Sequence, residues 1–215
     1  RLDVEVKRLG QRWHIAYEDA LKVSELTSVG TVGKKNTGTS VHFKPNPTYF
    51  DSASVSLLKL KHVLRAKAVL CPGLRITLND ESSAEKTEWY YENGLSDYLL
   101  DQLKHLNLLP QEGFISSASS ERESVEWAIA WATDAGEGIT ESYVNLVPTA
   151  QGGTHVNGLR TGLTEAVREF CEFQSLLPRG VKITPDDVWE RCHYVLSIKL
   201  EDPQFSGQTK ERLTS

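Results

Sequence analysis

The first 43 residues alternate apolar and polar side chains with a period of two, and they contain no helical pattern. The alternating apolar positions are Val4, Val6, Trp13, Ile15 and Tyr17. This alternation is typical of strands that are buried on one face of a sheet. An antiparallel sheet needs a second layer against its apolar face. Because no helix is expected here, the segment predicts only half of a domain.

Four strands in meander order are expected in this segment, forming a twisted antiparallel sheet. A turn at residues 9–11 separates the first two strands, and residues 23–29 give a weaker third one. The turn-rich residues 30–38 lead to a fourth strand at residues 39–43, which Pro45 ends because proline cannot donate to the ladder.

Helix and strand patterns are mixed beyond a boundary that is expected within residues 46–54. Helices are expected at residues 54–70, 94–106 and 154–173, with a short one opening at Pro185. Strands are expected at residues 74–78, 87–91, 114–117, 124–132, 141–147 and 193–200. This mixture predicts an α+β fold.

The longest expected helix, residues 154–173, begins directly after Gly152 and Gly153. Two glycines allow the backbone to approach a neighbour closely, whether a ligand or a packed part of the chain. Thr154 is the expected N-cap. The expected core stripe of this helix consists of Leu159, Leu163, Val167, Phe170 and Cys171.

Composition limits the class of protein. The net charge of −5 and a pI near 5.7 argue against a surface that binds nucleic acid throughout, although they allow a local basic patch. No apolar run approaches the roughly 18 residues that a membrane helix needs. The chain has no methionine, and it is interpreted as a piece of a longer protein. The thiols of Cys71, Cys171 and Cys192 are expected to be reduced core groups of a cytoplasmic protein.

The sequence contains no convincing metal or nucleophile motif. The six histidines show neither HxxxH nor HExxH spacing, so no metal site is expected. Cys192 and His193 are neighbours on one strand and point to opposite faces. Residues 33–40 have the glycine spacing of a phosphate-binding P-loop. However, Thr39 stands where the lysine should be, and a strand follows instead of a helix, so this interpretation is rejected.

Two basic positions are candidates for binding an anion. Gln208 and Lys210 follow the last strand on a turn-rich loop, where an amide and an ammonium group suit a terminal phosphate. Arg160 lies between Gly158 and Gly162 on the long helix, where small residues allow a phosphate backbone to come near. The alternative for each position is a solvated surface.

Several of these segments together resemble one family, the ATPase subunits of bacterial type IIA topoisomerases. Residues 141–149 and 152–155 resemble its transducer domain, and residues 202–210 resemble the loop through which that domain reaches the ATP γ-phosphate. Residues 34–43 resemble the last strands of its GHKL-type ATP-binding domain. Residues 66–73 and 177–182 resemble the B-subunit of topoisomerase IV more than that of gyrase.

The resemblance implies two domains. Residues 1–46 would be the C-terminal strands of the GHKL ATP-binding domain, and residues 47–215 a transducer domain that ends in the Gln-Thr-Lys loop. In this family the transducer contains a left-handed βαβ crossover, which is an exception to the usual handedness of such connections.

The resemblance also implies roles for four residues. Lys210 would be catalytic, binding the γ-phosphate and stabilising charge in the transition state, and Gln208 would contact the same phosphate. Thr39 would lie in the adenine pocket. Arg160 would line the cavity through which the transported DNA passes. The parent protein would use ATP and Mg²⁺, but none is expected bound to this piece.

The implied activity is an ATP-driven isomerase reaction that passes one DNA duplex through another, giving decatenation, relaxation and chromosome segregation. The implied partners are the DNA duplex, the DNA-cleaving A-subunit of topoisomerase IV, and a second copy through the ATPase region. No membrane is involved, and the setting is the bacterial cytoplasm at the nucleoid. The family's catalytic glutamate, its Mg²⁺-binding asparagine and its adenine-reading aspartate have no counterpart in this chain, which is therefore expected to be inactive alone.

Two alternatives remain open. One is a gyrase B-subunit, or a mismatch-repair or chaperone ATPase of the same superfamily. The other is a non-catalytic nucleic-acid-binding or interaction module, which the acidic pI argues against and which the salt dependence of DNA affinity would distinguish. With no nucleotide to hold, Gln208 and Lys210 are expected on an exposed, mobile loop.

Overall fold

The computed structural model describes residues 1–50, 52 and 54–215, which form two compact units, Arg1–Leu57 and Leu58–Ser215. Two residues of the expected boundary, 51 and 53, lie outside the described residues, and the division into domains at residue 46 stays a prediction.

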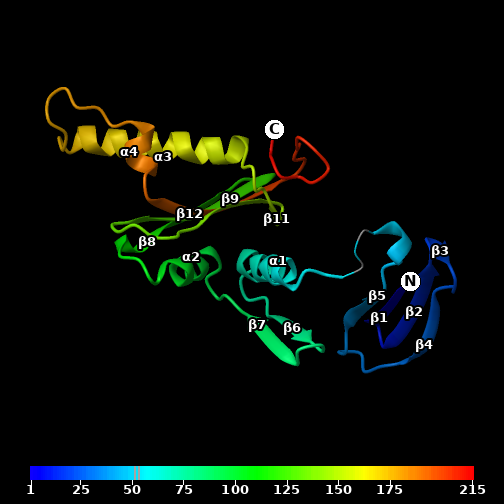
Figure 1. Cartoon of the computed structure of the whole chain (residues 1–215). Helices are drawn as coiled ribbons and strands as arrows, with labels where there is room; N and C mark the ends of the chain where they lie inside the picture. Colours follow the sequence, from blue (N-terminus) through cyan, green and yellow to red (C-terminus); the bar gives the residue numbers. More distant parts are fainter. Residues whose placement is uncertain (51, 53) are drawn as a thin grey trace. The chain divides into compact units, whose positions relative to one another are not determined.

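The first unit contains β1 (Leu2–Arg8), β2 (Gln11–Glu18), β3 (Leu21–Lys22), β4 (Thr27–Thr31), β5 (Gly38–Phe43) and the short 3₁₀ helix η1 (Pro47–Tyr49). The second unit contains α1 (Leu57–Leu70, whose first residue belongs to the first unit), β6 (Ile76–Asp80), β7 (Glu85–Trp89), α2 (Leu95–Leu103), β8 (Leu108–Ser119), β9 (Glu123–Ala132), β10 (Thr140–Val144), β11 (Val147–Pro148), α3 (Thr154–Phe173), α4 (Pro185–Trp189) and β12 (Cys192–Leu200). Figure 1 shows these elements along the chain.

The sheet of the first unit is antiparallel, but it is not a meander. The expected hairpin between β1 and β2 is present, with Leu9 and Gly10 both at positive φ. The expected third strand is replaced by the short β3 and β4, which both pair with β2. The fourth strand, β5, pairs with β1 instead of its predecessor. The meander prediction was wrong because the turn-rich residues 32–37 are long enough to carry the chain back to the free edge of β1.

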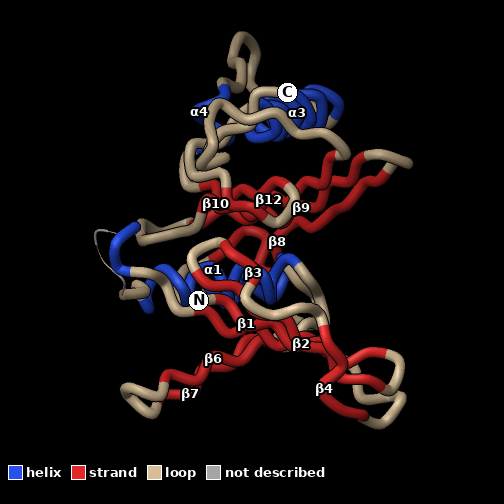
Figure 2. The backbone as a smooth tube through the Cα atoms, turned by 90° about the vertical axis from the view of Figure 1, so that its right-hand side faces the viewer, coloured by secondary structure: helices blue, strands red, loops and turns tan. Residues whose placement is uncertain are grey.

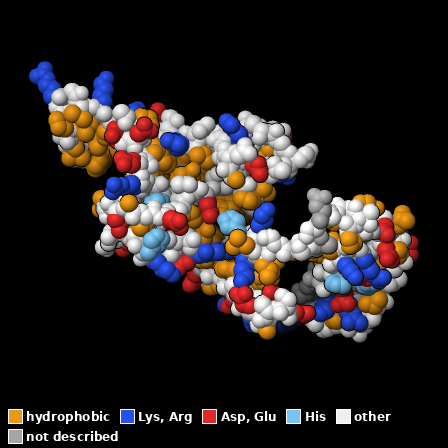
Figure 3. Space-filling view, viewed as in Figure 1, with side chains coloured by type: hydrophobic (Ala, Val, Ile, Leu, Met, Phe, Trp, Pro, Cys, Tyr) orange, Lys and Arg blue, Asp and Glu red, His pale blue; other side chains and the backbone are white. Residues whose placement is uncertain are grey.

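The first sheet has little core of its own. Of residues 1–50, all of which the structure describes, only Ala16 is buried. Large apolar side chains are exposed on it, including Leu21, Val41 and Phe43. Exposed hydrophobic atoms are visible across this unit in Figure 3. This agrees with the expectation that the segment is half of a domain.

The second unit is a layered α+β structure, as expected. Its main sheet has the order β11-β10-β12-β9-β8, and a two-stranded hairpin is formed by β6 and β7. Strands β10 and β12 are parallel, and α3 lies in the connection between them, which makes a βαβ unit. Helices α1 and α2 cover one face of the sheet and α3 the other (Figures 1 and 2). The left-handed sense of the crossover stays a prediction.

Along β9 and β12, successive side chains point to opposite faces of this sheet, and apolar side chains are packed on both faces. Ala128 of β9 and Val195 of β12 pack with α1 and α2, whereas their neighbours Trp127 and Leu196 pack with the start of α3. Both strands are therefore buried on two faces, which explains why their apolar runs are nearly continuous.

A polar network lies between the helices and β10. The Glu141 carboxylate accepts hydrogen bonds from the hydroxyls of Tyr98, at 3.1 Å, and of Tyr143. The Arg65 guanidinium lies over the Tyr98 ring and bonds to Asp101. Burial and the Glu141 charge raise the pKa of both tyrosines, so the hydroxyls stay protonated and able to donate.

Two local predictions for the second unit, those of a strand and of a core position, were wrong. The strand expected at residues 141–147 is two strands, because Asn145 and Leu146 adopt positive φ and turn the chain between β10 and β11. Phe170 is 58% exposed instead of in the core stripe. Phe173 and Leu176 are exposed as well, and Figure 3 shows hydrophobic side chains gathered on the surface at this end of α3.

The N-cap of α3 was also misplaced. The cap position is Gly153, whereas Thr154 is the first helical residue, and its hydroxyl donates to the Ser215 carbonyl oxygen at 2.6 Å. Among the described residues no helix has the length and apolar content to cross a membrane.

Candidate functional site

The C-terminal residues fold back into a closed loop. Phe205 and Leu213 form an antiparallel bridge, and the Ser206 amide donates to the Arg212 carbonyl oxygen at 3.1 Å. One step further out, the Thr214 amide donates to the Gln204 carbonyl oxygen at 2.9 Å. Residues 206–212, which we call the lysine loop, are thus held at their base by backbone hydrogen bonds.

The base of the lysine loop is anchored to the start of α3. The Leu213 amide donates to the Gly152 carbonyl oxygen at 3.1 Å, and the Thr154 amide donates to the Leu213 carbonyl oxygen at 3.3 Å. Gly153 has φ +135°, and a β-carbon there would lie 2.7 Å from the Leu213 nitrogen. The expected close approach is found at Gly153, where the neighbour is the backbone of Leu213, whereas a β-carbon at Gly152 would meet only the Val156 side chain.

The Leu213 side chain extends this anchor into the core. It is 2% exposed and packs with Val144, Leu196 and Ile198 of the sheet. Val156 and Leu159 of α3 cover the same cluster. Burying a leucine side chain contributes about 1.5–3 kcal/mol, so the loop base is fixed by apolar packing as well as by hydrogen bonds.

Gln208 and Lys210 lie exposed on the lysine loop, which confirms that part of the expectation. The Lys210 amide donates to the Gly207 carbonyl oxygen at 3.1 Å, and Lys210 has φ +58°. Its ammonium group is 5.8 Å from the centre of the Phe205 ring and has no carboxylate partner among the described residues. The neighbouring Glu211 carboxylate instead accepts from the Gln151 amide at 2.8 Å. The ammonium group is therefore available to an anion.

Arg160 lies on the exposed side of α3 with its guanidinium group stacked on Trp189, 5.3 Å from the ring centre. The Trp189 indole donates to the Thr164 hydroxyl at 3.2 Å, and that hydroxyl donates to the Arg160 carbonyl oxygen. Helix α4 thus presents Trp189 as a platform for Arg160. Gly158 and Gly162 beside it have open space where a β-carbon would stand.

Thr39 lies in β5 and pairs with Val6 of β1, with its side chain exposed. It belongs to the first unit, whereas the lysine loop and Arg160 belong to the second. Within the second unit, the structure brings the lysine loop together with the start of α3.

His155 is a site residue that sequence reasoning missed, because the histidines were considered only as metal ligands and catalytic partners. Its Nε2 lies 3.0 Å from the Thr149 hydroxyl, and its Nδ1 is buried without a hydrogen-bond partner among the described residues. Burial lowers the pKa of His155 to about 4, so the ring is neutral at pH 7. Its position on the first turn of a helix, directly after two glycines, was the available signal.

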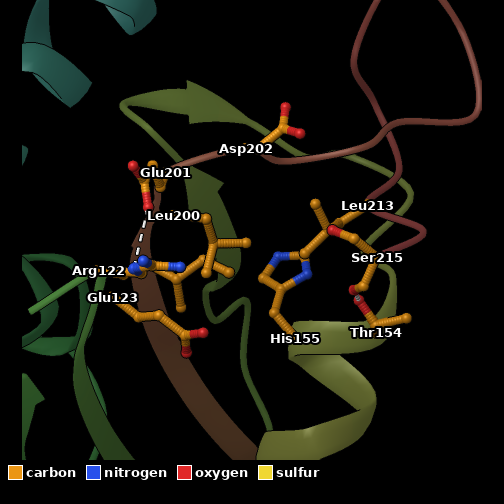
Figure 4. Close-up of a pocket in the computed structure, with 10 residues that line it drawn as sticks. Arg122, Glu123, Thr154, His155, Leu200, Glu201, Asp202, Leu213 and Ser215 are labelled. Carbon is orange, nitrogen blue, oxygen red and sulfur yellow. Dashed lines mark hydrogen bonds and ion pairs between the residues drawn. The ribbon is translucent and has the colours of Figure 1, made fainter. Parts of the chain in front are cut away.

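The His155 ring points into an open groove of about 490 Å³ beside the loop base. Figure 4 shows the ring with Leu200 on one side and Leu213 on the other, and with Thr154 and Ser215 close to Leu213. Arg122 and Glu201 form an ion pair at 3.5 Å at the far side of the groove.

The described cysteines form no disulfide, and Cys192 is buried, which raises the pKa of its thiol to about 12. Cys71 and Cys171 are only partly buried. No group of three histidine, cysteine, aspartate or glutamate side chains among the described residues is arranged to hold a metal ion.

This arrangement is that of an α+β protein whose last strand leads into a lysine-bearing loop anchored on the helix of a βαβ unit. The family model for DNA gyrase B matches residues 94–215, more than half of the chain, and the chain belongs to that family.

Within that family, the chain is similar to topoisomerase IV proteins. It is 57% identical over all 215 residues to the B-subunit of DNA topoisomerase 4 from Pseudomonas aeruginosa. That match covers 34% of the relative, so the chain spans about a third of its length.

Two solved structures have the same fold over the whole chain. The topoisomerase IV ATP-binding domain of Francisella tularensis, solved with a small-molecule inhibitor, is 42% identical with a TM-score of 0.82. The 43K ATPase domain of Thermus thermophilus gyrase B, solved with an aminocoumarin, is 27% identical with a TM-score of 0.83. This chain covers 58% of each of those chains.

Proposed function

We propose that this chain is part of the ATPase subunit of a DNA topoisomerase IV. Residues 1–46 supply the last strands of the ATP-binding domain, and residues 47–215 supply the transducer. The parent protein couples ATP binding and hydrolysis to the passage of one DNA duplex through another. Its partners are the DNA duplex, the A-subunit of topoisomerase IV, and a second copy of itself, in the bacterial cytoplasm at the nucleoid.

The anchored lysine loop is the observation that carries this proposal. Lys210 is an exposed cation on a short loop whose base is fixed to α3 through Gly153 and Leu213. The nearest carboxylate in sequence, that of Glu211, is occupied by Gln151. An anion that approaches the loop therefore meets the ammonium of Lys210 and the amide of Gln208, a donor set that suits a terminal phosphate.

The chemistry of the loop follows from this donor set. Lys210 binds the γ-phosphate of ATP and stabilises the charge that develops on it as its bond to the β-phosphate breaks. Gln208 donates to the same phosphate. Loss of the phosphate releases the loop, and because its base is joined to α3, the release is transmitted to the βαβ unit.

Two further residues complete the proposed sites. Thr39 serves the adenine pocket through its exposed hydroxyl. Arg160, stacked on Trp189, lines the DNA cavity and contacts the phosphate backbone without reading sequence. Mg²⁺ would be held by the phosphates of the nucleotide and by residues outside this chain, where the catalytic glutamate would also lie.

A kinetic experiment on the full-length parent protein, assembled with its DNA-cleaving partner, tests the role of Lys210. Lys210→Ala is expected to reduce ATP turnover about 10²–10³-fold, the loss typical of removing one donor that stabilises transition-state charge. ADP affinity should be unchanged, because ADP lacks the γ-phosphate. Lys199→Ala, which removes an exposed lysine of β12, is the matched control and should retain turnover. Undiminished turnover in Lys210→Ala would overturn the proposal.

A further inference from the structure

A chain of hydrogen bonds ties the first turn of α3 to the β10–β11 hairpin. The Thr149 hydroxyl donates to the Ser142 carbonyl oxygen at 2.9 Å, and it lies 2.7 Å from the Ser142 hydroxyl. A hydroxyl has one proton, and the Thr149 hydroxyl directs it at the Ser142 carbonyl oxygen, so the Thr149 oxygen accepts from His155 Nε2 at 3.0 Å. Ser142 is 8% exposed and Thr149 is 3% exposed, which protects this chain of bonds from water.

His155 connects this chain of bonds to the base of the lysine loop. Its ring is fixed by Thr149, and its backbone belongs to the helical turn that pairs with the loop base. Thr154, its neighbour, bonds to Leu213 through the backbone and to Ser215 through the side chain. A shift of this turn relative to Thr149 would therefore break the His155 bond and displace Leu213 together.

The displacement of Leu213 has a direct consequence for the lysine loop. Leu213 is paired with Phe205 across the loop base, so only residues 206–212 lie between the two clamped positions. The positions of Gln208 and Lys210 are consequently fixed through the same turn of α3 that His155 holds.

We propose that His155 is a positioning residue for the lysine loop. By bonding to Thr149, it fixes the start of α3, and with it the loop base, at the place where Lys210 meets the γ-phosphate. The inference rests on the proposed function of Lys210. In this role His155 would touch neither the nucleotide nor the reacting atoms, because its ring bonds to Thr149 and faces the groove between Leu200 and Leu213 (Figure 4).

Replacements of His155 in the full-length parent protein, assembled with its DNA-cleaving partner, test the inference. His155→Ala is expected to lower kcat on the order of 10-fold to 100-fold, the loss that follows a misplacement of about 1 Å, with ADP affinity unchanged. His155→Gln should recover most of kcat, because its amide nitrogen can reach the position of Nε2 and donate to Thr149. Thr149→Val should lower kcat as His155→Ala does, and His62→Ala, an exposed histidine of α1, should leave it unchanged.

A double variant separates positioning from a general loss of structure. If His155 acts through Lys210, then His155→Ala combined with Lys210→Ala should be no slower than Lys210→Ala alone. A further 10-fold loss in the double variant would overturn the inference, and so would a His155→Ala variant with the kcat of the wild type. A folded His155→Gln variant that recovers no activity would also contradict it.

The same measurements distinguish a failure of the proposed function. If Lys210→Ala turns over ATP as fast as the wild type, the proposed role of the loop is wrong, and this inference falls with it. If Lys210→Ala is slow and His155→Ala is not, only the inference on His155 is wrong.

Discussion

Gly153 and Leu213 pair through their backbones so closely that a β-carbon at residue 153 would lie 2.7 Å from the Leu213 nitrogen and 2.9 Å from its carbonyl carbon. Gly153 has φ +135°, which side chains disfavour. The start of α3 and the base of the lysine loop therefore behave as one structural element, and any change that separates them should affect both stability and activity.

The pairing predicts that Gly153→Ala destabilises the second unit. The backbone conformation alone costs about 1–3 kcal/mol for a residue with a side chain, and the overlap with the Leu213 backbone adds to this. Urea unfolding of the 215-residue chain would measure the loss in the free energy of unfolding.

Gly158→Ala is the matched control for that variant. Gly158 lies within the same helix, and beyond the adjacent backbone of that helix and its two chain neighbours an added β-carbon would meet no atom within 4 Å. The replacement should therefore stabilise the chain by about 0.5–1 kcal/mol, the difference between alanine and glycine in a helix. A Gly153→Ala variant that is as stable as Gly158→Ala would contradict the pairing.

The polar network around Glu141 predicts that Tyr143→Phe lowers the free energy of unfolding by about 1–3 kcal/mol, because a partly buried carboxylate loses a donor. Tyr90→Phe is the control, since Tyr90 is 45% exposed and its hydroxyl has no hydrogen-bond partner among the described residues. It should change stability by less than about 0.5 kcal/mol. If the two replacements changed the free energy of unfolding equally, the Tyr143–Glu141 hydrogen bond would contribute nothing to stability.

His155 predicts a pH dependence of stability. Its pKa is about 4 in the folded chain, below the ordinary value of 6.5, because burial disfavours the charged ring. Between these two values the unfolded chain binds the proton and the folded chain does not, so stability falls as the pH falls through this window. The stability difference between the wild type and His155→Gln should therefore shift against the wild type from pH 7 to pH 5. Urea unfolding at both pH values measures it, and a constant difference would argue against a buried neutral ring.

Arg160 predicts a salt-dependent contribution to DNA affinity in the parent protein. Arg160→Ala should weaken duplex binding in the presence of a non-hydrolysable ATP analogue and reduce the salt slope by about one. Arg160→Lys keeps the charge and should retain most of the slope. An unchanged salt slope in Arg160→Ala would show that Arg160 does not contact the DNA backbone.

The long periodic elements could be predicted from the sequence. The helix at residues 154–173 and the alternating strand that ends at Ala132 were found with their observed ends or within one residue of them. Their patterns are strong because β9 is packed on both faces and α3 packs on the sheet through Val156 and Leu159 of its first turns. The order of strands in the first sheet was not predicted, because β5 is joined to β1 by long-range pairing that no local pattern reports.

The site was predictable only in part for the same reason. The glycines before α3 and the lysine near the C-terminus were both identified, but Gly153 and Lys210 are far apart in the sequence, and their relation appears only through the pairing with Leu213. His155 was passed over because its significance comes from Thr149 across a turn. Thr149 follows β11, a strand that was not expected because Asn145 and Leu146 adopt positive φ and divide one expected strand into two.

The most direct test of the account is the structure of the parent protein with a non-hydrolysable ATP analogue bound. The distance from Lys210 Nζ to the nearest γ-phosphate oxygen should be about 2.7–2.9 Å, the length of a charge-assisted hydrogen bond. Gln208 should donate to the same phosphate, and the Gly153–Leu213 pairing should be intact. A bound analogue whose γ-phosphate is contacted by neither Lys210 nor Gln208 would contradict the central claim.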